Sequence, residues 1–147
     1  TAAPKHFRRR RLEWPLHVTI LPWFTVPDEP VFISFLERHL PSESAFDAII
    51  GEHTAFGEAG ETPVSLVENR APFAAMHNYV LEAVLGQQGT VLMNTWIRES
   101  YKPHVTHHGD NRLYPGDTFM VQSLSLVRLL DKDMCEIVTT VSLGKAK

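Results

Sequence analysis

The chain has 147 residues, enough for one domain with a substantial core, and its 44% apolar and 21% charged composition is ordinary for a globular protein. No apolar run reaches the roughly 18 to 20 residues that a membrane-spanning helix needs, the net charge of −3 argues against a general nucleic-acid coat, and a single cysteine, Cys135, excludes an internal disulfide. We therefore expect a cytoplasmic monomer that has no membrane partner and no obligate protein partner.

A basic arm precedes the domain. Five of the 14 basic residues lie within residues 1–11: Lys5, Arg8, Arg9, Arg10 and Arg11. Residues 12–147 contain no linker or low-complexity segment, so we expect them to form a single domain. The arginine run is typical either of a segment that contacts a polyanion such as RNA or of a mobile, solvated tail.

The apolar periodicity predicts a mixture of strands and two amphipathic helices. Asp28 is a suitable cap for the first helix, which Pro41 ends, and Pro72 opens the second, which ends at Gly86 or Gly89. The predicted elements are, in chain order, a strand at 12–22, a turn at 23–27, a helix at 29–40, strands at 46–56 and 63–68, a helix from 72, strands at 90–96, 102–107, 118–130 and 134–143, and a turn at 131–133. This order indicates an α+β protein.

Two of the predicted strands carry the same tripeptide, His-Val-Thr, at residues 17–19 and again at 104–106. Side chains alternate between the faces of a strand, so each copy presents an imidazole and a hydroxyl on one face and a valine on the other. An imidazole can accept or donate a proton near neutral pH, and a hydroxyl can donate a hydrogen bond to an anionic oxygen. Two such units that face each other would supply an acid, a base and two donors around one anion.

The stretches 16–20 and 103–106 resemble the paired H-x-T/S motifs of the two-histidine (2H) phosphoesterases, which include the 2'-5' RNA ligase-like proteins and the cyclic nucleotide phosphodiesterases. The likeness extends to aromatic residues soon after the first motif, Trp23 and Phe24, and to the pair Phe56-Gly57. It implies a bilobal, pseudo-symmetric α+β fold in which antiparallel sheets line a central cleft and helices lie outside.

The resemblance also implies roles for the motif residues. His17 and His104 would form the acid–base pair, and Thr19 and Thr106 would donate hydrogen bonds to phosphate oxygens. The implied reaction is hydrolysis of a 2',3'-cyclic phosphate or a 2'-5' phosphodiester on a nucleotide or an RNA end, with no metal and no other cofactor. Which histidine is the base remains open.

Further candidate ligand contacts lie close to the motifs. Many 2'-5' RNA ligase-like proteins follow the second motif with Leu-Ala-Arg or similar, whereas this chain has His107-His108-Gly109. The missing cation would then come from Lys102, Arg112 or a charged His107. Among the aromatic residues near the motifs, Tyr101 and Phe56 are our first choices for ligand contact, although core packing is their commoner use.

Several alternatives remain open. Within the enzyme class they are an ADP-ribose cyclic phosphate phosphodiesterase and an RNA-end 2'-5' ligase, and outside it a non-catalytic nucleotide- or RNA-binding module. The histidines at 104, 107 and 108 also suggest a metal-binding protein, but consecutive strand positions diverge, so we expect no metal site. Of the remaining histidines, His6 lies in the arm, and we expect His53 to face solvent and His39 and His77 to lie at the surface or its boundary.

Overall fold

The computed structural model describes residues 7–10, 15–93, 95–131 and 134–146. Two α-helices are present in this part of the chain, α1 (Glu29–His39) and α2 (Arg70–Gly86). Short 3₁₀ helices lie at Leu40–Ser42 and Arg98–Ser100. The strands are β1 (Phe7–Arg10), β2 (Phe24–Thr25), β3 (Phe46–Phe56), β4 (Thr62–Val67), β5 (Thr90–Val91), β6 (His104–Thr106), β7 (Thr118–Val121), β8 (Ser123–Leu129) and β9 (Met134–Ser142).

The chain divides into two compact units. Unit 1 comprises residues 1–15, 33–47 and 120–147, and unit 2 comprises residues 16–32 and 48–119. In unit 1, β9 lies between β1 and β8 in a three-stranded antiparallel sheet. This pairing includes residues 7–10 of the basic arm, while residues 1–6 and 11 lie outside the described part. Both copies of the tripeptide fall within unit 2.

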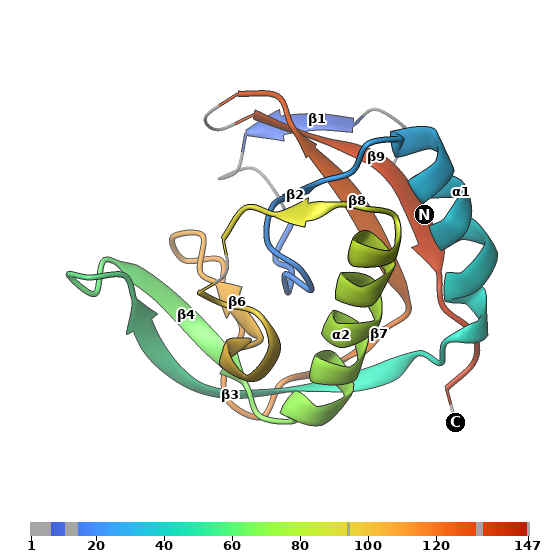
Figure 1. The fold of residues 1–147 in the computed structure, drawn as a ribbon. Helices are drawn as coiled ribbons and strands as arrows, with labels where there is room; N and C mark the ends of the chain where they lie inside the picture. Colours follow the sequence, from blue (N-terminus) through green and yellow to red (C-terminus); the bar gives the residue numbers. More distant parts are fainter. Residues whose placement is uncertain (1–6, 11–14, 94, 132–133, 147) are drawn as a thin grey trace. The chain divides into compact units, whose positions relative to one another are not determined.

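Unit 2 contains the long hairpin of β3 and β4, with β6 beside β4 (Figure 1). The order of this four-stranded sheet is β6-β4-β3-β7, and β2 pairs with β5 in a separate two-stranded sheet. The hairpin turns at Gly57, whose φ of 95° is one that glycine adopts without strain. The expected α+β class and antiparallel sheets are therefore confirmed.

The helices and the hairpin form where the sequence predicts them. The amide of Val31 donates to Asp28 Oδ1 at 3.1 Å, so Asp28 does cap α1. Residues of α2 on its apolar side are buried, and they join strand residues in the core of unit 2. The largest apolar side chains of unit 2 that are almost fully buried are Phe32, Ile50, Val64, Phe73, Leu81, Val84 and Val105. No helix in the described residues is both long and apolar enough to span a membrane.

Four expectations about strands and turns are wrong. Residues 15–22 form no strand, and only Val18 makes a β-bridge; residues 12–14 lie outside the described part. The expected strand at 90–96 ends at Val91, with Asn94 not described, and the expected strand at 118–130 is divided at Gln122 into β7 and β8. Phe24 and Thr25, expected in a turn, form β2. The turn expected at 131–133 includes two residues, 132 and 133, that are not described.

Candidate active site

The register of the four-stranded sheet decides which side chains share a face. Leu66 lies opposite His104 and Val64 lies opposite Thr106. On the next strand, Thr54 lies opposite Val64 and Phe56 lies opposite Thr62. Residues that are directly opposite in an antiparallel pair point to the same side. His104, Thr106 and Phe56 therefore share one face of the sheet, which we call the motif face.

The segment that carries the first tripeptide joins β6 on the side away from β4. Its contact is a single antiparallel bridge between Val18 and Val105. In this register Thr19 comes opposite His104 and His17 comes opposite Thr106. Diagonal positions of an antiparallel pair are about 7–8 Å apart, so the bridge brings the two predicted motifs together.

His104 is half-buried and its protonation site is defined by its surroundings. Its Nδ1 lies 2.7 Å from the carbonyl oxygen of Lys102. A carbonyl can only accept, so Nδ1–H is the donor and Nε2 of the neutral ring keeps its lone pair. Burial lowers the pKa of His104, the bond to Lys102 opposes this, and the nearby His17 lowers it further when charged. This electrostatic effect is a second indication that the two histidines are close.

The first motif is more accessible than the second. His17 and Thr19 are exposed, whereas Thr106 is half-buried and Val105 is fully buried. The valine of the second copy therefore anchors β6 in the core while its histidine and threonine remain reachable. This is the behaviour that the alternating tripeptide predicts.

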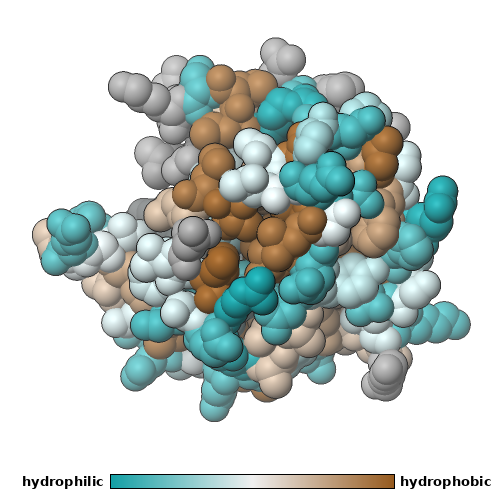
Figure 2. Space-filling view, in the orientation of Figure 1, coloured by the Kyte–Doolittle hydropathy of each residue, from teal (hydrophilic) through white to brown (hydrophobic). Residues whose placement is uncertain are grey.

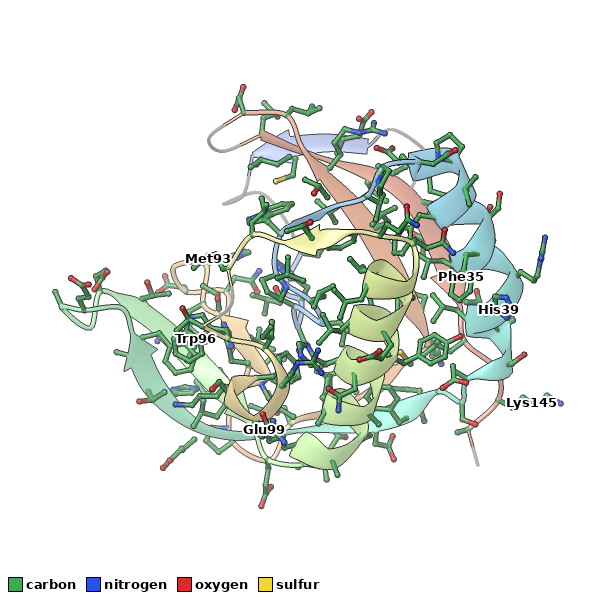
Figure 3. The ribbon with its side chains drawn as sticks, viewed as in Figure 1. Phe35, His39, Met93, Trp96, Glu99 and Lys145 are labelled. Atoms are coloured by element: carbon green, nitrogen blue, oxygen red, sulfur yellow. The ribbon has the colours of Figure 1, made fainter. Side chains whose placement is uncertain are left out.

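An aromatic pair lies next to His104. The Phe56 ring meets the His104 ring edge-on at a centroid distance of 4.7 Å and stacks on the Trp96 ring at 5.8 Å, with 19° between the planes. Trp96, which is labelled in Figure 3, is 39% exposed. Lys102 Nζ lies over its ring, 5.4 Å from the centroid. Figure 2 shows apolar surface over the segment after β5, where Leu92 and Met93 are also exposed. Phe56, Trp96 and Lys102 can therefore form one side of a ligand site.

Two other candidate contacts lie away from the motif face. Tyr101 is 4% exposed, and its hydroxyl donates to the carbonyl oxygen of Thr19 at 2.8 Å. His107 is 7% exposed, and its Nε2 lies 2.8 Å from Ser65 Oγ. Ser65 lies opposite Val105, on the face opposite to His104 and Thr106. His107 also packs against His53, at a centroid distance of 4.7 Å, so it belongs to a second cluster behind the sheet.

The same geometry separates the histidines considered for a metal. His104 and His107 lie on opposite faces of their strand, so they cannot ligate one ion together. Among the described residues, no three histidine, cysteine or acidic side chains are arranged to hold a metal ion. His108 follows in a tight bridge with Asn111. Arg112, another candidate for the missing cation, donates to the carbonyl oxygen of Gly109 at 2.6 Å.

Sequence reasoning missed two residues that hold the motifs. His77 is fully buried, so the expectation that it lies at the surface or boundary is wrong. It lies four residues from Phe73 and four from Leu81, on the apolar stripe of α2, and this spacing was a usable signal. Arg70 donates from Nε to the carbonyl oxygen of Tyr101 at 2.9 Å. Nothing in the sequence pattern indicated that contact.

The arrangement has the parts that acid–base chemistry at an anionic centre requires. The neutral ring of His104 has a lone pair available, and His17 lies diagonally across the Val18–Val105 bridge from it. The hydroxyl groups of Thr19 and Thr106 occupy the other diagonal. Groups placed in this way can remove a proton on one side of a phosphate, deliver one on the other, and stabilise the charge between them.

Comparison with known proteins identifies a family and a similar fold. The family model described as the 2'-5' RNA ligase superfamily matches residues 1–132. Among solved structures, the crystal structure of TT0787 of Thermus thermophilus is similar, with a TM-score of 0.62 and 20% sequence identity. The alignment covers 90% of this chain and 80% of that one. No curated protein matches the chain.

Proposed function

Because the chain belongs to the 2'-5' RNA ligase superfamily, we propose that it cleaves a 2',3'-cyclic phosphate or a 2'-5' phosphodiester on a nucleotide or an RNA end without a metal. Membership in this superfamily supports an enzyme of the phosphoesterase or ligase type. For the finer assignment, acid–base cleavage of a phosphodiester, the supporting observation is the antiparallel bridge between Val18 and Val105. In its register His17 and His104 fall on one diagonal and Thr19 and Thr106 on the other.

In the proposed reaction, His104 is the base. Its Nδ1–H is engaged by the Lys102 carbonyl, and burial favours the neutral ring, so Nε2 can accept a proton from water. The water oxygen forms a bond to phosphorus as it loses that proton. The bond from phosphorus to the ribose oxygen breaks on the opposite side.

His17 is the proposed acid. It is exposed and lies diagonally opposite His104, as in-line displacement requires. It gives its proton to the departing ribose oxygen. Thr19 and Thr106 donate hydrogen bonds to the phosphate oxygens that carry the developing charge. After one turnover His104 holds the proton and His17 is neutral, so proton exchange with water restores the starting state.

The aromatic pair supports a nucleotide as the substrate. A nucleobase stacks on an exposed aromatic face with a gain of about 1–3 kcal/mol. Trp96 offers such a face, with Phe56 behind it and Lys102 available for a phosphate. Replacing Trp96 with alanine should therefore raise KM for a nucleoside cyclic phosphate about 10-fold or more, with a smaller effect on kcat.

The main test is turnover of 2',3'-cyclic nucleotides in excess chelator by the wild-type chain, His17→Ala and His104→Ala. We expect wild-type activity that resists chelator and a loss of at least about 10²-fold in each variant. Activity retained in either variant would refute the assignment of that histidine. Tight binding without turnover of cyclic nucleotides, RNA ends and cyclic ADP-ribose phosphates would instead indicate a binding module.

A further inference from the structure

Side chains hold much of the backbone of the segment that carries His17. Within residues 15–22, Val18 alone makes a β-bridge, so this segment lacks the ladder of hydrogen bonds that fixes β6 against β4. The next two carbonyl groups, those of Thr19 and Ile20, instead accept from side chains of unit 2. The position of the backbone that carries His17 therefore depends on these two acceptor bonds as well as on the bridge.

The two donors form one rigid pair. The Tyr101 hydroxyl donates to Thr19 O at 2.8 Å, and His77 Nδ1–H donates to Ile20 O at 2.7 Å. Their rings stack with centroids 4.2 Å apart and 9° between the planes, and His77 is 0% exposed. The amide of Arg98 donates to His77 Nε2 at 3.0 Å, which fixes the tautomer. Burial also lowers the pKa of His77, so the ring stays neutral.

Helix α2, which carries His77, also holds the segment that leads to His104. Arg70 donates from Nε to Tyr101 O at 2.9 Å and from Nη2 to Arg98 O at 3.1 Å. Arg98 has a φ of 58°, a conformation that costs energy in a residue other than glycine and persists because its surroundings hold it. Helix α2 thus fixes the first motif through His77 and the approach to the second through Arg70.

We propose that His77 and Tyr101 are positioning residues that set His17 at the correct distance from His104, an inference that rests on the proposed function. Neither residue touches the reacting atoms. A shift of about 1 Å in a reacting group can reduce the rate about 100-fold. Loss of either hydrogen bond, from Tyr101 to Thr19 or from His77 to Ile20, should therefore lower kcat much more than it changes substrate binding.

Tyr101→Phe is the sharpest test, because it retains the ring and its stacking and removes only the hydroxyl. We expect kcat to fall about 10- to 100-fold with KM changed less than about threefold. The matched control is Tyr114→Phe, which removes an exposed hydroxyl and should leave both parameters unchanged. In single turnovers of His17→Ala, adding Tyr101→Phe should cause a smaller loss than Tyr101→Phe causes in the wild-type chain, because Tyr101 acts largely through His17.

His77 gives a second, graded test. His77→Asn keeps an N–H group near the position of Nδ1, whereas His77→Phe keeps the ring and loses the donor. We expect His77→Asn to retain more kcat than His77→Phe. Equal losses in the two variants, or losses in Tyr101→Phe that appear in KM alone, would overturn the inference. If Tyr101→Phe does not fold, His77→Phe, which also loses a donor, carries the same measurements.

The ring signals of His17 in a ¹H–¹³C correlation spectrum provide a readout that does not depend on turnover. We expect them to shift or broaden in Tyr101→Phe, while those of His39, in unit 1, stay in place. Unchanged His17 signals in folded Tyr101→Phe would overturn the positioning role. If the wild-type chain cleaves no cyclic phosphate but the His17 signals shift, then the proposed function fails and the positioning role remains.

Discussion

The Phe56 ring stands edge-on to the His104 ring, with centroids 4.7 Å apart and 72° between the planes. This contact covers part of the imidazole, and burial is the largest cause of the lowered pKa of His104. The hydrogen bond to the Lys102 carbonyl acts in the opposite direction. The hydrocarbon of Phe56 therefore favours the form of His104 that can accept a proton.

This contact predicts where activity is lost in acid. A base works only while it is neutral, and the pKa of His104 lies below the ordinary value of 6.5. The acidic limb of kcat/KM should therefore fall below pH 6.5, and Phe56→Ala should move it up toward that value. Tyr114→Ala, which removes an exposed ring, serves as the control. If the acidic limb of kcat/KM in Phe56→Ala lay at the same pH as in the wild type, or at a lower pH, the proposed effect of Phe56 would be wrong.

The hydroxyl of Thr106 can be tested by an isosteric change. Thr106→Val keeps the size and the β-branched shape but cannot donate to a phosphate oxygen, so we expect kcat to fall about 10²- to 10³-fold. Thr106→Ser keeps the hydroxyl and should retain most of the activity. The control is Thr118→Val, at an exposed position of β7. Steady-state kinetics would contradict the role if the valine and serine variants behaved alike.

The sequence was most informative where local chemistry decides the structure. The expected strand at 46–56 has the bounds of β3, and the capped helix expected at 29–40 matches α1 to within one residue. Periodicity and capping are local, so a window of the sequence contains the information. The repeated tripeptide also singled out two segments that the structure joins through the Val18–Val105 bridge, since chance seldom repeats an imidazole and a hydroxyl at one offset.

Long-range contacts explain what the sequence did not predict. Residues 15–22 are not a strand, because the carbonyls of Thr19 and Ile20 accept from Tyr101 and His77. The alternation of histidine and threonine around the Val18–Val105 bridge depends on a register between segments far apart in the chain. His107 was a candidate ligand contact by sequence proximity alone. The strand alternation instead directs it toward Ser65.

The buried His77 makes the folded state sensitive to acid. An unfolded histidine titrates near pH 6.5, and burial lowers the pKa of His77 in the fold. Between these two pKa values the unfolded chain binds more protons than the folded chain. The contribution of His77 to the free energy of unfolding is therefore complete above pH 6.5 and decreases as the pH falls through this window. Protonation of His77 Nε2 would also break the hydrogen bond that this atom accepts from the amide of Arg98. The charges of Arg70 and Arg98 disfavour the protonated ring further.

Urea unfolding at several pH values measures this effect. His77→Asn removes one titrating group, so the slope of unfolding free energy against pH below about 6.5 should decrease by up to about 1.4 kcal/mol per pH unit. His104 and His107 have lowered pKa values as well and should maintain part of the slope. Tyr101→Phe should lower stability without changing the slope. An unchanged slope in His77→Asn would show that His77 does not titrate in this way.

The cluster of His53, Ser65 and His107, on the face of the sheet opposite to the motif face, should contribute to stability and not to catalysis. Ser65 Oγ donates to the carbonyl oxygen of Leu113 at 2.9 Å, so it accepts from His107 Nε2–H. Ser65→Ala leaves His107 Nε2–H buried without a partner, while the Leu113 carbonyl keeps its bond from His53 Nε2, and this should cost about 1–3 kcal/mol of unfolding free energy. Ser123→Ala, at an exposed position, should cost less than about 0.5 kcal/mol.

The kinetic half of this prediction follows from the register. Ser65 lies opposite Val105, and Val105 points away from the face that carries His104 and Thr106. Since the strand separates the two groups, kcat and KM of Ser65→Ala should stay within about threefold of wild type under conditions where the variant is folded. A large rise in KM with little loss of stability would mean that the cluster of His53, Ser65 and His107 reaches the substrate, contrary to the alternation along β6.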